Sequence, residues 1–408
     1  MGWVNEARLT RRRLLGGIGS AAIAAGLAGC GSSAKPAGAP SVTAAPASPS
    51  QSAGPTPTPS AKPSPTAIDD AALRRKIASL LVVGFRGETV ASDDWIMRAI
   101  ADGLGGVILF DQDQLTKTRR NIASPSQVTT LIRTLKKAAP GRLIVSVDQE
   151  GGQIARLNPG DGFAATKSQA DIGAANSTAT TRAWAQGLVH ELTSVGFNLN
   201  FAPVVDLNIN RSNPAIGALD RSFSANPDVV VACATEEIKV HRSAGVRTVL
   251  KHFPGLGSAT GNTDFGVVDV SKTWKPIELE PYQKLIKADS VDSIMAAHVL
   301  NHQLDPKLPA SLSHAVVHDL LRVKLGWTGP VVSDDMQAVA ISSKYGRSEA
   351  TTMAVEAGVD MLVFANQETY NTKIVSETID TVLALVHSGK VTLAQINQSV
   401  ARVDQLRP

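Results

Sequence analysis

Short apolar runs recur along the chain after residue 78. Each is followed by a loop rich in glycine or polar residues, and then by a stretch with apolar positions at three- and four-residue intervals. Continuous apolar runs of this length predict strands that are buried on both faces, as in a parallel sheet. The eight runs lie at residues 79–85, 105–110, 142–148, 197–203, 246–252, 291–298, 329–335 and 359–365.

The segments between the runs predict helices. The clearest lie at residues 124–139, 178–196 and 348–358, and each begins at or near Ser or Thr, residues favoured at helix N-termini. Strands that alternate with helices predict an α/β protein with a parallel sheet. Eight such units favour a (β/α)8 barrel. A doubly wound sheet remains the alternative, because periodicity does not reveal whether a sheet closes.

The first 30 residues have a different pattern. A basic segment, LTRRRLLGG, precedes a run of small and apolar residues that stops at Cys30, which predicts an export signal too short to span a membrane. Arg11 and Arg12 resemble a twin-arginine signal, and LAGC, which ends at Cys30, resembles the lipobox of bacterial lipoproteins. We therefore expect cleavage before Cys30, its acylation, a membrane anchor and an extracytoplasmic location. An ordinary signal with a chance cysteine is the alternative.

Residues 31–66 contain nine of the 22 prolines, together with Ala, Ser, Thr and Gly, and no acidic or aromatic residue. Such a composition buries too little apolar surface to offset the entropy of ordering, so we expect a tether. The predicted organisation is a signal peptide at 1–30, a disordered tether at 31–66 and a folded domain at 67–408.

The net charge of +4 comes from the front of the chain. Residues 1–66 carry six basic residues and one acidic residue, a sum of +5, which leaves −1 for the rest. The folded part thus lacks the basic character of nucleic-acid-binding proteins, and we expect no nucleic-acid partner. Cys30 and Cys233 are the two cysteines, so an acylated Cys30 would leave no intrachain disulfide.

Ionisable residues end several of the apolar runs. The carboxyl ends of barrel strands meet at one face, where the following loops carry the chemistry, so we expect these side chains to lie together. Because side chains alternate along a strand, only one carboxylate of the adjacent pair at 334 and 335 is expected to face the barrel mouth; helix capping is the alternative for that pair. The residues are Asp148, Lys251, His252, His298, Asp334 and Asp335.

Two further stretches suit a ligand rich in hydroxyl groups. Asp148 opens DQEGGQIAR, in which glycines let the chain turn and return to Arg156, and Arg221 lies in LDRSFSANP. Guanidinium groups present paired donors and carboxylates accept from vicinal hydroxyls. Ion pairing among these three residues is the alternative.

Two weaker signals point elsewhere. The GLGSATG loop follows an apolar run like a dinucleotide-binding loop, but no helical pattern opens after it. His298 and His302 have the spacing of a zinc helix, but no glutamate follows His298 and the segment is turn-like, so we expect no metal.

Six stretches, in this order along residues 75–365, together resemble glycoside hydrolase family 3, and in particular single-domain bacterial β-N-acetylglucosaminidases that process cell-wall fragments. The resemblance implies a (β/α)8 catalytic domain, hydrolysis with retention of anomeric configuration, a small saccharide or muropeptide substrate and no metal or organic cofactor. We also expect a monomer. The stretches are DQEGGQIAR, NFAPVVDLN, DRSFSANP, KHFPGLG, IMAAHVL and VVSDDM.

The resemblance also implies roles for individual residues. The aspartate directly after the serine of VVSDDM, Asp334, matches the family nucleophile. A retaining enzyme pairs such a carboxylate with a proton donor, and we expect Lys251 and Arg156 to keep Asp334 ionised. The positions that match the family's binding residues for sugar hydroxyls are Asp148, Arg156, Arg221, Lys251 and His252.

The proposed proton donor is where the chain departs from the family pattern. The glucosaminidases commonly read KHFPGHG, then four residues, then Asp-Ser-His, and use that Asp-His dyad as general acid/base. Here the corresponding residues are Leu256 in place of the histidine of the glycine loop, and Asn262, Thr263 and Asp264 in place of the dyad segment. We favour Asp264 as the acid, which would require a raised pKa. A group elsewhere, or a weak or inactive homologue, is the alternative.

The expected function is release of N-acetylglucosamine from peptidoglycan-derived muropeptides by an exported lipoprotein. The alternatives are another family 3 β-glycosidase, a phosphorylase, or a sugar-binding lipoprotein without catalysis.

Overall fold

The computed structural model describes residues 68–407. The predicted signal peptide, the tether and Cys30 lie outside the described residues. Within residues 68–407, no helix is both long and apolar enough to cross a membrane.

All eight predicted runs contain strands of one parallel sheet, and the fifth run contains two. The sheet order is β7-β6-β3-β2-β1-β11-β10-β9-β8. Its two edge strands, β7 and β8, are separated in sequence only by Val249, so the sheet closes into a barrel. This confirms the (β/α)8 prediction over the doubly wound alternative. The strands are β1 (Leu81–Gly84), β2 (Gly106–Ile108), β3 (Ile144–Val147), β6 (Leu199–Asn200), β7 (Arg247–Thr248), β8 (Leu250–Phe253), β9 (Ile294–Ala296), β10 (Val331–Asp335) and β11 (Met361–Phe364).

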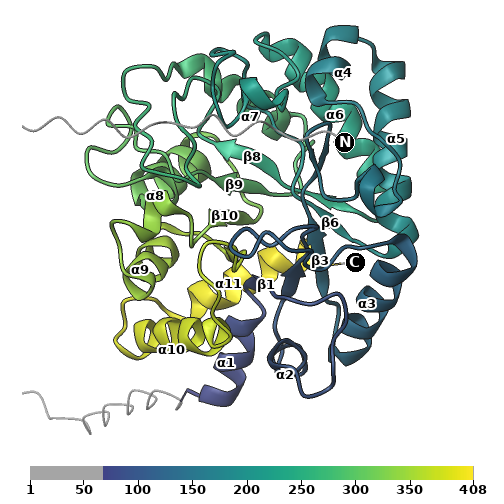
Figure 1. Cartoon of the computed structure of the whole chain (residues 1–408). Coiled ribbons are helices and arrows are strands. Elements are labelled where there is room, and N and C mark those ends of the chain that lie inside the picture. Colours follow the sequence, from purple (N-terminus) through teal and green to yellow (C-terminus); the bar gives the residue numbers. More distant parts are fainter. Residues whose placement is uncertain (1–67, 408) are drawn as a thin grey trace, which may run out of the picture. The chain divides into compact units, whose positions relative to one another are not determined.

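Helices surround the strands (Figure 1). The predicted helices at 124–139, 178–196 and 348–358 are confirmed as α3, α5 and α9. The α-helices are α1 (Asp70–Ala78), α2 (Trp95–Ala101), α3 (Pro125–Ala138), α4 (Gln169–Ala175), α5 (Thr178–Val195), α6 (Pro227–Ser243), α7 (Glu280–Lys287), α8 (Val339–Ser342), α9 (Arg347–Ala357), α10 (Ile374–His387) and α11 (Leu393–Val403), with a π-helix η5 (Ala315–Lys324) and 3₁₀ turns η1 (Pro159–Asp161), η2 (Gly217–Leu219), η3 (Pro276–Leu279), η4 (Ala310–Leu312) and η6 (Asp404–Leu406).

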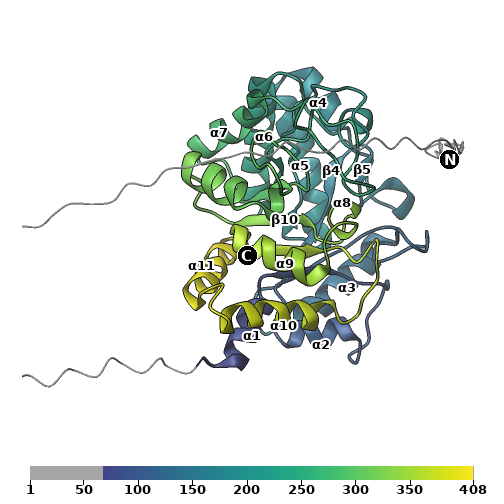
Figure 2. The same cartoon turned by 90° about the vertical axis from the view of Figure 1, so that its left-hand side faces the viewer.

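The last helices return to the first one. Figure 2 shows α10 next to α1 and α9. Two polar contacts join α10 to α1. His387 Nε2 lies 3.0 Å from Asp70 Oδ1, and Arg74 Nη1 forms an ion pair with Asp380 Oδ1 at 2.8 Å. The first helix of the described residues therefore packs against one of the last, which completes the helical layer.

Arg120 holds the strand ends together beside the barrel mouth. Its side chain is fully buried; Nε donates to the Phe85 carbonyl at 2.8 Å and Nη2 to the Ala365 carbonyl at 2.9 Å. Nη1 pairs with Asp113 Oδ2 at 3.1 Å. A buried guanidinium needs such partners to offset its desolvation, so the loops after β1, β2 and β11 are held at fixed positions.

A short hairpin follows β3. It consists of β4 (Gln149–Gly151) and β5 (Ile154–Ala155), which pair antiparallel. Gly151 and Gly152 have φ angles of +91° and +59°, which favour glycine. The hairpin returns the chain to Arg156, as the sequence predicted.

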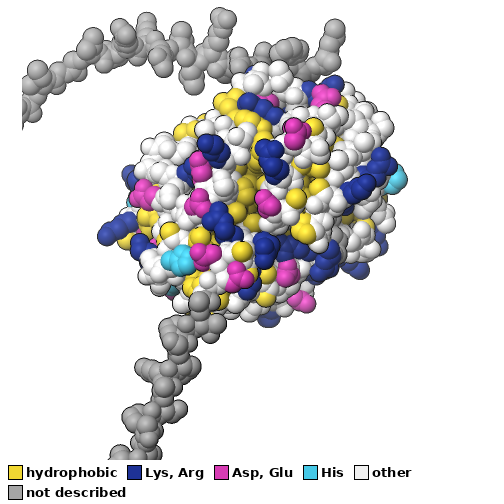
Figure 3. Space-filling model, turned by 90° about the horizontal axis from the view of Figure 1, so that it is seen from below, with side chains coloured by type: hydrophobic (Ala, Val, Ile, Leu, Met, Phe, Trp, Pro, Cys, Tyr) yellow, Lys and Arg dark blue, Asp and Glu magenta, His cyan; other side chains and the backbone are white. Residues whose placement is uncertain are grey.

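Charged side chains of both signs are interspersed over the face drawn in Figure 3. The mixture agrees with the near balance of 34 basic and 35 acidic residues after residue 66.

Candidate active site

A cavity of about 450 Å³ opens at the carboxyl ends of the strands. This volume lies in the usual range for a small-molecule site. All seven side chains that the sequence singled out for chemistry or sugar binding line it: Asp148, Arg156, Arg221, Lys251, His252, Asp264 and Asp334.

Lys251, on β8, is the centre of a buried ionic cluster in the cavity wall. Its side chain is 3% exposed, and Nζ lies 2.7 Å from Asp148 Oδ1 and 2.7 Å from Glu150 Oε1. Arg221 forms a bidentate ion pair with the same Glu150. Its Nε donates to Oε2 at 2.7 Å and its Nη2 donates to Oε1 at 2.8 Å. The ion pairing given as the alternative, among Asp148, Arg156 and Arg221 themselves, is not found among the described residues. Arg221 pairs with Glu150, Asp148 with Lys251 and Arg156 with Asp111.

The sequence analysis missed Glu150. Burial by itself raises the pKa of this carboxyl group, but Arg221 and Lys251 outweigh burial and lower the pKa to about 2. Glu150 is thus a fixed negative charge that positions two cations. Its position two residues after Asp148 could have predicted that both carboxyl groups lie on the same face, because alternate residues of an extended segment share a face.

His252 is oriented by Asp206 at the base of the cavity. Nδ1 of His252 lies 2.7 Å from Asp206 Oδ2, and Asp206 also accepts the backbone N–H of Leu256 at 2.7 Å. Nε2 of His252 lies 3.5 Å from Arg221 Nη2. Asp206 and Arg221 therefore fix the imidazole in the cavity wall.

Asp334, on β10, carries an ionised carboxylate. Burial raises its pKa, but His298, His252 and Lys251 act in the opposite direction, as does the backbone N–H of Asp335, and the net pKa is below the ordinary value. The Asp335 N–H donates to Asp334 Oδ1 at 2.9 Å. The positive surroundings expected for Asp334 are thus confirmed for Lys251.

Arg156 occupies another part of the cavity wall. Its Nη1 lies 3.8 Å from Asp111 Oδ1, and its guanidinium lies 5.6 Å from the centre of the Phe110 ring. Nε has no hydrogen-bond partner among residues 68–407. Arg156 therefore pairs with Asp111 and retains donors for a ligand.

Asp264 lies on the loop after β8, and the pKa of its carboxyl group is raised above the ordinary value. Burial raises its pKa, and the negative charge of Asp334 raises it further, against smaller effects of Arg221 and His252. The loop is anchored on α8, because Ala340 N donates to Thr263 O at 3.0 Å. The loop thus holds the carboxyl group beside Asp334 in this structure.

The expectation that only one of the two adjacent aspartates faces the barrel mouth is wrong. Asp335 lines the cavity as well as Asp334, because the pairing of β10 with β11 is irregular between Val332 and Asp335 and the simple alternation is lost. Burial raises the pKa of the Asp335 carboxyl group well above the ordinary value, and the negative charge of Glu368 raises it further. Glu368, after β11, was also missed by the sequence analysis.

The two histidines with zinc-like spacing do not converge. Nδ1 of His298 lies 2.6 Å from Ser311 Oγ and Nε2 lies 2.8 Å from the Asp335 carbonyl. His302 is exposed and bonds the Pro306 carbonyl at 3.0 Å. His298 is therefore an internal hydrogen-bonding residue, and it is the one member of the six ionisable residues at the ends of the apolar runs that does not line the cavity.

Sequence comparison gives relatives over most of the described chain. The glycosyl hydrolase family 3 N-terminal domain matches residues 72–406. A β-hexosaminidase of Tolumonas auensis is 35% identical over 268 residues, which cover 64% of this chain and 76% of the relative. A β-hexosaminidase of Xanthomonas euvesicatoria is 34% identical over 303 residues, covering 71% and 84%.

Solved structures agree with the sequence relatives. A family 3 β-N-acetylglucosaminidase from Paenibacillus sp. is 34% identical with a TM-score of 0.74, and covers 82% of this chain; this chain spans 62% of that protein, less than two thirds. A β-N-acetylhexosaminidase from Beutenbergia cavernae is 30% identical with a TM-score of 0.71, covering 81% of this chain and 97% of its own.

One buried carboxyl group near the ionic cluster has no evident partner. Glu237, on α6, is fully buried, and neither carboxyl oxygen has a hydrogen-bond partner within residues 68–407. Burial raises its pKa well above the ordinary value, and the charge of Glu150 adds to this. Glu237 therefore keeps its proton in the folded protein, whereas the unfolded chain releases it above about pH 4.3. Because the unfolded state then binds fewer protons, the contribution of Glu237 to the free energy of unfolding falls as the pH rises above that value.

The first prediction concerns this proton. Glu237→Gln keeps the shape of the protonated side chain and removes its titration, so the free energy of unfolding of the variant relative to the parent should increase between pH 4 and pH 8. We expect an increase of about 1 kcal/mol or more, because one pKa unit corresponds to about 1.4 kcal/mol. Urea unfolding at several pH values measures it. Glu236→Gln, which removes the neighbouring partner of Arg182, is the control without such an increase. A pH-independent effect of Glu237→Gln would contradict the prediction.

Proposed function

The chain belongs to glycoside hydrolase family 3, and from that premise we propose that it is a retaining β-N-acetylhexosaminidase that removes terminal N-acetylglucosamine from peptidoglycan-derived fragments. In this proposal Asp334 is the nucleophile and Asp264 is the acid/base. The cluster around Lys251 holds the sugar.

The observation that carries the proposal is that two carboxyl groups of one cavity have pKa values shifted in opposite directions. Asp334 has a lowered pKa and Asp264 a raised one. A retaining glycosidase needs such a pair, an ionised carboxylate that attacks the anomeric carbon and a carboxylic acid that protonates the leaving oxygen. Environments that push two pKa values apart are the usual sign of acid and base roles.

The polar wall beside this pair suits a sugar. Asp148 accepts hydrogen bonds, and it is held in place by its ion pair with Lys251. Arg156, whose side chain is 30% exposed, and His252 line the same cavity. Hydrogen bonds to hydroxyl groups that strengthen as the ring flattens would stabilise the transition state.

The choice of sugar rests on the relatives. β-Hexosaminidases and β-N-acetylglucosaminidases are the names given to the similar proteins. The peptidoglycan fragment as substrate follows from the resemblance and from the expected position in the cell envelope.

The second prediction tests Asp334. The protein should hydrolyse the nitrophenyl glycoside of N-acetylglucosamine in preference to those of glucose and xylose. Asp334→Asn should lower kcat by about 1,000-fold or more, because the covalent step is lost. A mechanism-based fluorosugar should label a peptide that contains Asp334 in the parent and in Asp335→Asn, but not in Asp334→Asn.

Three outcomes would contradict this assignment. Label on another carboxyl group would exclude Asp334 as the nucleophile. Preference for glucose or xylose would favour another β-glycosidase. Formation of a sugar phosphate only when phosphate is present would favour a phosphorylase.

The third prediction distinguishes the two possible proton donors. Asp264→Ala should lower kcat/KM about 100-fold or more for a natural disaccharide, in line with the usual contribution of general acid catalysis. It should cost far less for a dinitrophenyl glycoside, whose leaving group needs no proton. Glu368→Gln is the matched variant and should affect both substrates equally. The reverse pattern in the two variants would assign the acid role to Glu368, and equal losses in Asp264→Ala would exclude Asp264.

The fourth prediction concerns location. We propose that acylated Cys30 anchors the protein to the outer side of the cell membrane, on the evidence of LAGC and the preceding signal-like segment. Cys30→Ala should move the full-length protein from the membrane fraction of a bacterial host to a soluble fraction. Cys233→Ala, which changes the buried free cysteine of the folded part, is the control. Equal partition of all three proteins would contradict the anchor.

A further inference from the structure

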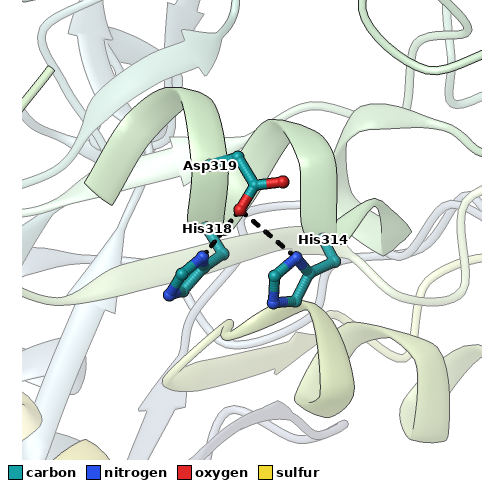
Figure 4. Close-up of side chains that lie close together, drawn as sticks. All are labelled: His314, His318 and Asp319. Atoms are coloured by element: carbon teal, nitrogen blue, oxygen red, sulfur yellow. Dashed lines mark hydrogen bonds and ion pairs between the residues drawn. The ribbon is translucent and has the colours of Figure 1, made fainter. Parts of the chain in front are cut away.

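A second group of chemically active side chains lies outside the cavity, at the start of η5. Nδ1 of His318 is 2.8 Å from Asp319 Oδ1, and Nδ1 of His314 is 3.5 Å from the same oxygen. Figure 4 shows the two imidazoles side by side with the carboxylate above them. Their ring centres are 4.4 Å apart, and the planes differ by 26°. Among residues 68–407, this is the one group of three His, Cys, Asp or Glu residues whose donor atoms all lie within 4.8 Å of one another.

The π-helix explains why three donors meet here. In an α-helix, a residue four positions on lies over the first, whereas a residue five positions on is turned away. A π-helix has wider turns, closed by bonds from i to i+5, and such turns are frequent at functional sites. In η5 the residues four and five positions after His314 are both brought next to it. The helix thus places His318 and Asp319 on one face.

The donor types select a class of ion. Two imidazole nitrogens and one carboxylate oxygen suit a borderline cation such as Zn²⁺, with bonds of about 2.0–2.2 Å, whereas Mg²⁺ and Ca²⁺ prefer oxygen ligands. Asp319 Oδ1 lies 3.5 and 2.8 Å from the two imidazole nitrogens, distances close to the separation that such bonds require, and all three donor atoms lie within 4.8 Å of one another. The side chains are exposed, at 60%, 46% and 62% for His314, His318 and Asp319, so water can complete the coordination.

We propose that His314, His318 and Asp319 form a surface site for a divalent transition-metal ion such as Zn²⁺. Three protein ligands leave one position of a tetrahedral site open to solvent. None of the three residues lines the catalytic cavity, so the inference does not depend on the proposed function.

The site is connected to the cavity wall by a short path. Ser311, three residues before His314, bonds His298, and His298 bonds the Asp335 carbonyl. An ion held at the start of η5 would therefore stabilise the segment that positions these groups. We expect the main effect on stability, since ligation of the folded form adds to its stability by mass action.

Calorimetric titration of the metal-free protein with Zn²⁺ tests the proposal. The parent should bind one ion at a saturable site, and the double variant His314→Ala/His318→Ala should bind it at least about tenfold more weakly. The matched control is His190→Ala/His387→Ala, which removes two exposed histidines from other helices and should leave the affinity unchanged. Zn²⁺ should raise the thermal unfolding midpoint of the parent and of the control, but not of the His314/His318 variant.

A competing cation and two checks of the fold complete the experiment. Mg²⁺ should not compete with Zn²⁺, because the ligands are mainly nitrogen. Circular dichroism and hydrolysis of the nitrophenyl substrate should show that the exposed substitutions leave the fold intact. Unchanged Zn²⁺ affinity in the double variant, loss of binding in the control, or titration without saturation would overturn the proposal.

Discussion

The burial of Lys251 is the interaction on which the rest of the site depends. An ammonium group that is 3% exposed is stable only if its partners are fixed around it, and Asp148 and Glu150 each approach it within 2.7 Å. Removal of one partner from such a cluster typically costs about 3–5 kcal/mol, because a buried charge is left without compensation. The partners follow β3, whereas Lys251 is on β8 and Arg221 lies in the loop after β6. The cluster therefore requires a closed barrel with its strand ends at one level, and the same cluster forms the cavity wall that is proposed to bind the sugar.

The positive charges of this cluster also help to explain why the pKa values of two aspartates in one cavity are shifted in opposite directions. Asp334 faces Lys251 and His252, which favour its ionised form. Asp264 is buried, with the negative charge of Asp334 nearby, and the effects of Arg221 and His252 are too small to offset both. The loop lacks the Asp-His pattern, but Asp264 is a chemically reasonable acid for the proposed function, because a single carboxyl group with a raised pKa can provide the proton.

The sequence predicted the architecture better than the arrangement of its charges. Eight apolar runs and their intervening helices were correct because burial on both faces leaves a strong pattern in the sequence. Barrel closure could not be predicted from the pattern, since it depends on the division of one run into β7 and β8 at Val249.

The prediction for Asp335 was wrong because the irregular pairing of β10 is a tertiary feature. Glu368 and Glu237 were missed because each lies in a stretch without a motif, and only the fold brings them beside other carboxyl groups. The convergence of His314, His318 and Asp319 depends on a π-helix, which the helical period does not predict.

The coupling between Asp334 and Asp264 has a further consequence for a two-step reaction. The charge of Asp334 is one of the causes that raise the pKa of Asp264. In the proposed mechanism Asp334 becomes an ester when it attacks the sugar and loses that charge, so this contribution disappears and the pKa of Asp264 falls. Asp264 would by then have given its proton to the leaving group, and a lower pKa favours the carboxylate that the second step needs as a base. Hydrolysis of the ester would restore the charge on Asp334 and with it this upward contribution to the pKa of Asp264. Electrostatic repulsion between the two carboxyl groups therefore acts in the direction that the proposed change of Asp264 from acid to base requires.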